Sequence, residues 1–89
     1  MAEVTLTVTH KIGLHARPAA EFVKTARQFP CSIKITFGER SVNAKSILNV
    51  LSLGVNMGAV ITIQADGQGA DEAVAALTDL IKSNFGGIE

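Results

Sequence analysis

The chain has 89 residues, of which 47% are hydrophobic, 18% are charged and only 4% are aromatic. This length suits one hydrophobic core, and the composition is too apolar for a disordered chain. Eight basic residues balance eight acidic ones, so the chain lacks the basic excess typical of nucleic-acid-binding domains. We expect residues 1–89 to form a single domain that does not bind nucleic acid.

The neutral total hides an uneven distribution of charge. Residues 10–50 carry seven Lys and Arg against two Glu, whereas residues 51–89 carry one Lys against five acidic residues. The first region therefore has a net charge of +5 and the second of −4, with Glu3 supplying the remaining −1. A basic half in a neutral protein indicates a charged docking face.

The cysteine content and the N-terminus exclude several classes of protein. Cys31 is the single cysteine, so the chain has neither an internal disulfide nor a cysteine-based zinc site. No apolar signal core follows Met1, and no run of 18 apolar residues is present. We expect a cytoplasmic monomer with no membrane insertion, metal or cofactor.

The first elements follow from hydrophobic periodicity. Residues 4–9 alternate β-branched and apolar side chains with threonines, which predicts a half-buried strand. A loop containing Gly13 follows, and residues 16–28 then place apolar side chains at helical spacing. Pro18 fits the first turn of that helix, and Pro30 marks its far boundary.

Residues 32–37 alternate again and predict a second strand. A tight turn at residues 38–40 then leads into a short third strand over 41–43. Ser46 is a favoured N-cap, so a brief helix is expected to follow it and to end near Gly54.

The last elements are a fourth strand over residues 60–65, a glycine-rich turn over 66–69 and a helix over about 70–84. The predicted order is therefore β-α-β-β-α-β-α. Strand pairs with helices between them indicate an α+β fold, in which helices cover one face of a four-stranded antiparallel sheet.

His15 is the first candidate for chemistry, since it directly precedes the first turn of a helix. The leading N–H groups and the helix dipole form an anion site there, and they disfavour protonation of an imidazole. Arg17 adds a planar, permanently charged donor for phosphate oxygens. Together they suit acceptance and release of a phosphoryl group. Taken by themselves, the two residues favour the simpler interpretation of a surface histidine that caps a helix and a solvated arginine.

Ser46 is the second candidate. Its structural role is that of an N-cap, but a phosphate added there would lie beside Lys45. Ile47, Leu48 and Leu51 cannot all be buried on so short a helix, and an exposed apolar patch indicates docking.

Two segments resemble the signatures of the HPr family, the histidine-containing phosphocarriers of the bacterial phosphoenolpyruvate:sugar phosphotransferase system. Residues 13–19, Gly-Leu-His-Ala-Arg-Pro-Ala, match the active-site motif of that family. Residues 45–54 match its second signature, around a regulatory serine, and the resemblance extends over essentially the whole chain. Ile12 departs from the small or polar residue that is common ahead of the active-site glycine.

The resemblance implies an open-faced β-sandwich with four antiparallel strands and three helices. It implies that His15 receives phosphate from enzyme I and passes it to the IIA domains of sugar permeases. Arg17 would neutralise phosphate charge, together with the backbone of Ala16 and Arg17. It further implies that Ser46 is phosphorylated by an HPr kinase/phosphorylase, and that the serine-phosphorylated form serves a catabolite control regulator.

Two functions therefore follow as hypotheses: a phosphoryl carrier that is not itself an enzyme, and a regulatory binding module, in catabolite or nitrogen control, that is switched at Ser46. An RNA-binding sheet has little support, because aromatic stacking residues and net basic charge are missing. We expect the partners to dock on one face around His15. Besides Ala16 and Arg17, the residues expected on that face are Ala20, Lys24, Arg27, Lys45, Ile47, Leu48 and Leu51.

Overall fold

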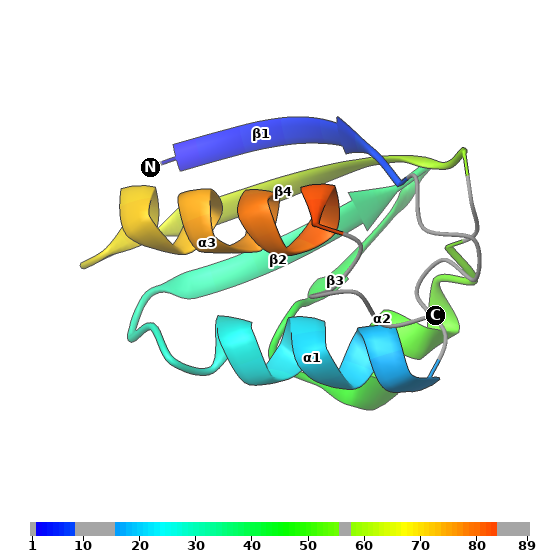
Figure 1. Ribbon diagram of the computed structural model, residues 1–89, viewed down its shortest axis with the longest axis horizontal. Helices are drawn as coiled ribbons and strands as arrows, with labels where there is room; N and C mark the ends of the chain where they lie inside the picture. Colours follow the sequence, from blue (N-terminus) through cyan, green and yellow to red (C-terminus); the bar gives the residue numbers. More distant parts are fainter. Residues whose placement is uncertain (1, 9–15, 56–57, 84–89) are drawn as a thin grey trace.

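The computed structural model describes residues 2–8, 16–55 and 58–83. The strands are β1 (Ala2–Thr7), β2 (Ser32–Phe37), β3 (Arg40–Asn43) and β4 (Val60–Asp66). The helices are α1 (Ala16–Ala26), α2 (Ile47–Ser52) and α3 (Ala70–Lys82). Figure 1 shows the four strands as one sheet, with the helices packed on one of its faces.

The strands lie in the order β1-β4-β2-β3, and every neighbouring pair is antiparallel. Because β4 lies between β1 and β2, these two strands run in the same direction, and α1 makes the connection between them. β2 and β3 form a hairpin in which Phe37 pairs with Arg40. Gly38, in the turn between them, has a φ of 63°, which glycine adopts without steric cost. The predicted α+β sheet is confirmed.

The side chains of the two central strands alternate between the core and solvent. Ile33, Ile35, Ile61 and Ile63 point to the helices and are at most 2% exposed. On the opposite face the residues are polar except for Val60, which is exposed, and the hydroxyls of Thr5 and Thr62 form a hydrogen bond of 3.1 Å there. One buried and one polar face is the pattern expected of an antiparallel sheet covered on a single side.

The two longer helices bury the faces that their periodicity predicts. In α1 the buried side chains are Pro18, Ala19, Phe22, Val23 and Ala26, and in α3 they are Ala70, Ala73, Leu77 and Ile81. Apolar side chains three and four residues apart share one face of a helix. These helices therefore complete the core that the sheet begins.

Some boundaries differ from the predicted ones. β1 ends at Thr7, although the alternation continues to Val8, and α1 ends at Ala26 rather than at residue 28. The amide of Gln28 donates to the carbonyl of Thr25 over 3.1 Å, a tight i to i−3 bond that closes the helix early. The last helix, α3, ends at Lys82 with Ser83 as its C-cap, two residues before the predicted end.

Candidate functional site

α1 begins at Ala16, directly after position 15. The backbone N–H groups of its first turn have no acceptor inside the helix. Pro18 lacks this group, so it belongs in the first turn, and its side chain is fully buried. The start of α1 is thereby fixed to the core. His15 lies outside the described residues, as do the side chains of Ala16 and Arg17.

Val8, on the other side of the candidate motif, is also fixed. Its side chain is 0% exposed. Its amide donates to the carbonyl of Ala59 over 2.8 Å, and its carbonyl accepts from the amide of Gly58 over 2.7 Å. Val8 and Pro18, which precede and follow His15 in the sequence, are therefore both fixed to the packed core.

Ser46 is the N-cap of α2, as predicted. Its backbone is extended, with φ −114° and ψ 116°, and its Oγ accepts from the amide of Asn49 over 3.4 Å. This is a long bond for N–H···O. The side chain is half-buried, so the hydroxyl caps the helix and still lies at the surface.

α2 exposes two of its four hydrophobic side chains. Leu48 is 77% exposed and Leu51 is 37% exposed, whereas Val50 points into the core. Ile47 is half-buried. The predicted apolar patch on this helix is therefore present.

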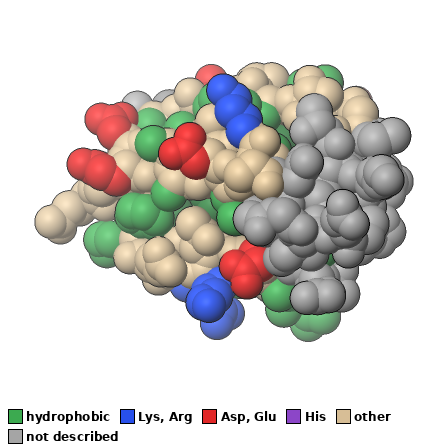
Figure 2. Space-filling model, in the orientation of Figure 1, with side chains coloured by type: hydrophobic (Ala, Val, Ile, Leu, Met, Phe, Trp, Pro, Cys, Tyr) green, Lys and Arg blue, Asp and Glu red, His purple; other side chains and the backbone are tan. Residues whose placement is uncertain are grey.

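A surface groove of about 330 Å³ lies between α1 and α2. Its lining residues are Ala20, Val23, Lys24, Arg27 and Ile47. Four of them belong to the docking face expected from the sequence, and the fifth, Val23, is a buried residue of α1. Figure 2 shows basic side chains over α1, with an acidic one beside them, and further acidic side chains over the N-terminal part of α3. The groove thus combines apolar side chains with two cations.

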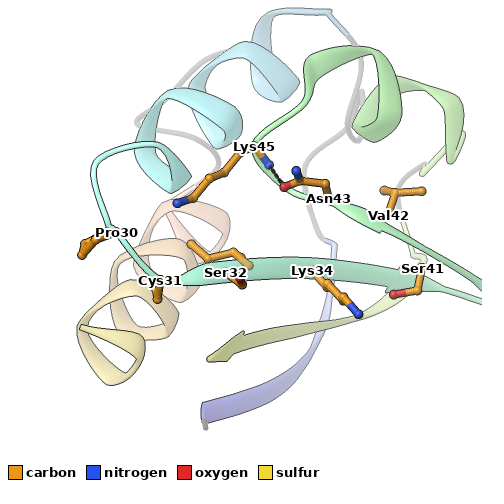
Figure 3. Close-up of a pocket in the computed structure, with 9 residues that line it drawn as sticks. Pro30, Cys31, Ser32, Lys34, Ser41, Val42, Asn43 and Lys45 are labelled. Atoms are coloured by element: carbon orange, nitrogen blue, oxygen red, sulfur yellow. Dashed lines mark hydrogen bonds between the residues drawn. The ribbon is translucent and has the colours of Figure 1, made fainter. Parts of the chain in front are cut away.

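Lys45 does not line this groove. Its Nζ donates to the carbonyl of Phe29 over 2.6 Å, and its amide donates to Oδ1 of Asn43 over 2.9 Å. Figure 3 shows the side chain extending toward Pro30, beside a hollow of about 380 Å³ along β2 and β3. Its ammonium group therefore has a partner within the protein.

Two arginine contacts near the site were not predicted. Nε of Arg27 donates to the carbonyl of Lys45 over 2.9 Å, across 18 residues of sequence. Nη1 and Nη2 of Arg40 donate to the carbonyl and Oγ of Ser52 over 2.7 and 3.2 Å. The sequence separation of these residues does not indicate that they are in contact. Both contacts form only because of the way α2 packs against the rest of the chain.

The comparisons with known proteins identify the family. A family model described as the PTS HPr component phosphorylation site matches residues 2–83. The chain belongs to the HPr family. The phosphocarrier protein HPr of Mycoplasma capricolum is 46% identical over 77 residues, which cover 86% of each chain.

Two solved structures from Thermoanaerobacter tengcongensis agree with this family. The crystal structure of HPr-C-His has a TM-score of 0.96 and 48% identity, and the match covers 100% of both chains. The crystal structure of an HPr dimer has a TM-score of 0.77 and 49% identity, covering 96% of this chain and 98% of that one. The open-faced sheet with three helices is therefore the HPr fold.

HPr proteins are phosphocarriers of the phosphotransferase system and not catalytic enzymes. This chain is accordingly a phosphocarrier that works with other components of that system.

None of the helices in the described part of the chain has the length and apolar content to span a membrane. Among residues 2–8, 16–55 and 58–83, no cluster of three or more His, Cys, Asp or Glu side chains is suited to a metal ion.

Proposed function

We propose that His15 accepts a phosphoryl group from enzyme I and passes it to the IIA domains of sugar permeases. In the first step a bond forms between a ring nitrogen of His15 and phosphorus, while the bond from phosphorus to enzyme I breaks. In the second step the IIA domain takes the same phosphoryl group, and the imidazole is regenerated. No oxidation or reduction occurs, and the chain returns to its unphosphorylated form.

The observation that carries this proposal is the start of α1 at Ala16. The N–H groups of Ala16 and Arg17 belong to the first turn, where the helix dipole favours negative charge. A phosphoryl group on the preceding residue would meet these donors. The guanidinium of Arg17 adds positive charge, so we assign it the neutralisation of phosphate in both transfers.

Enzyme I and the IIA domains would dock on the groove between α1 and α2. Its two cations suit an acidic partner, and its apolar side chains, with Leu48 and Leu51 of α2, supply hydrophobic contact. We assign the contacts with these partners to four residues of the groove: Ala20, Lys24, Arg27 and Ile47. The ammonium of Lys45 is bonded to the carbonyl of Phe29 and does not line the groove. We therefore assign Lys45 a minor part in docking.

A transfer assay tests the carrier role. With enzyme I and phosphoenolpyruvate, the chain should gain one phosphate that is lost in acid. Addition of a IIA domain should then discharge it, with one phosphate appearing on IIA for each one lost. A phosphorylated chain that gives no phosphate to any IIA domain of its host would contradict the second step.

We further propose that an ATP-dependent HPr kinase/phosphorylase phosphorylates Ser46. The γ-phosphoryl group moves from ATP to Oγ, and ADP and the hydroxyl proton are released. The exposed apolar side chains next to this serine support a switch of partners, in which added charge weakens one complex and favours another. If this role dominates, the chain is mainly a regulatory module that binds a catabolite control regulator.

An acid-stable phosphate distinguishes this second modification from the first. Host extract with ATP should add it to the wild-type chain and not to Ser46→Ala. The absence of any acid-stable phosphate under these conditions would argue against the regulatory role and would leave the carrier role untouched.

We propose that the carrier acts as a monomer, because a protein that enters other proteins' active sites needs its docking face free. The similar protein from T. tengcongensis has been crystallised as a dimer, so the oligomeric state of this chain is a direct test. Light scattering should give a mass near 9.3 kDa. A mass of twice that value at working concentration would refute the monomer.

A further inference from the structure

Arg27 is close to both neighbours of Ser46. Its Nε donates to the carbonyl of Lys45, the residue before the serine, over 2.9 Å. It also lines the groove together with Ile47, the residue after the serine. The amide of Arg27 donates to the carbonyl of Val23 over 2.9 Å, which fixes its backbone at the end of α1. The guanidinium of Arg27, the residue after α1, is therefore held beside the turn that begins α2, which packs against α1 (Figure 1).

Lys45 is the other cation near this serine, and its ammonium is engaged elsewhere. It is bonded to the carbonyl of Phe29 over 2.6 Å and is half-buried. In Figure 3 its side chain leads away toward Pro30. Movement of this ammonium to a phosphate would leave the Phe29 carbonyl without its donor, at a cost in free energy.

Arg27 has donors to spare. It is exposed, and its Nη1 and Nη2 have no partner among the described residues, since only Nε is used. A guanidinium carries five N–H donors in a fork that matches phosphate oxygens. The same side chain can thus keep its bond to Lys45 while its outer nitrogens bind a nearby anion.

We propose that Arg27 is the residue that senses phosphorylation of Ser46, through an ion pair between its outer nitrogens and the phosphate. This inference rests on the proposed modification of Ser46. Because Arg27 also lines the docking groove, the ion pair removes one of the two cations that an acidic partner would meet there. Phosphorylation then acts in two ways, by adding negative charge and by neutralising a docking residue.

The ionisation of the phosphate itself provides a readout that packing alone would not change. An ordinary phosphoserine has a second pKa of about 6, and a cation in contact with the phosphate lowers that pKa. We would install phosphoserine at position 46 during synthesis of the chain and follow its phosphorus-31 resonance against pH. This route needs no kinase, so failure of the kinase and failure of Arg27 are measured separately.

The pKa of the phosphate should be higher in Arg27→Gln than in the wild-type chain, by about half a pH unit for an exposed pair. Lys24→Gln is the matched control. It removes the same charge from the same groove, but Lys24 has no bond to Lys45 among the described residues. It should change the pKa much less. Arg27→Lys keeps the charge and loses the fork, and should fall between Arg27→Gln and the wild type.

Equal phosphate pKa values in wild type and Arg27→Gln would overturn the proposal. So would an equal rise in Arg27→Gln and Lys24→Gln, since that result would assign the effect to the general field of α1. Urea unfolding of each variant checks that the chain remains folded, and Arg27→Lys retains a positive charge at the site should Arg27→Gln fail to fold.

Discussion

At the scale of single residues, two glycines with positive φ differ in what surrounds them. Gly38 has a φ of 63°, and a Cβ built there would meet nothing within 4 Å. Gly67 has a φ of 121°, and a Cβ there would lie 3.3 Å from Cβ of Cys31. Asparagine tolerates the first conformation and not the second. Gly67 is therefore required by the turn that leads from β4 into α3.

Gly67→Asn should lower the free energy of unfolding by about 1–3 kcal/mol, the cost of a strained backbone. Gly38→Asn, the same substitution, should change it by less than about 0.5 kcal/mol. Urea unfolding followed by circular dichroism measures both values. An equal decrease in the free energy of unfolding in the two variants would show that the backbone conformation and close contacts of Gly67 do not require glycine there.

At the scale of elements, α2 depends on contacts from outside itself. It has six residues, and an isolated helix of this length does not form in water. Val50 attaches it to the core, and Arg40 of β3 binds its last residue, Ser52, through two nitrogens. Ser52 in turn donates to the carbonyl of Asn49 over 2.6 Å. Arg40 therefore links the sheet to the end of the helix.

Arg40→Ala should raise the amide hydrogen-exchange rates of α2 by several-fold, because each exposed hydrogen bond contributes about 0.5–1.5 kcal/mol. Glu39→Ala, in the adjacent turn, is the control, since Glu39 has no hydrogen bond to α2 among the described residues. Exchange measured by nuclear magnetic resonance separates α2 from the rest of the chain. Unchanged rates in Arg40→Ala would refute the link.

At the scale of the whole molecule, neutrality results from two separated regions of opposite charge. The cations of the groove are Lys24 of α1 and Arg27, which follows that helix, whereas acidic residues start α3. Lys24→Glu should weaken the complex with enzyme I by about tenfold at low salt, and less at high salt. Lys34→Glu makes the same change on the exposed face of the sheet and should have little effect. Equal losses would mean that net charge, and not the groove, governs docking.

The sequence predicted the sheet, the helical faces and the cap at Ser46, because each depends on local periodicity or on a preferred residue type. It could not predict that β4 lies between β1 and β2, since strand order depends on contacts distant in the chain. The bonds of Arg27 and Arg40 were missed for the same reason. Lys45 was expected at the docking face, but the carbonyl of Phe29 competes for its ammonium.

The chain contains two histidines, His10 and His15, and this gives the central claim its most direct measurement. After reaction with enzyme I and phosphoenolpyruvate, intact mass should show one phosphate on the wild-type chain and on His10→Ala. His15→Ala should show none, and mapping of the wild-type adduct should place the phosphate on His15. Equal labelling of His15→Ala and wild type would contradict the assignment of His15 as the phosphoryl acceptor.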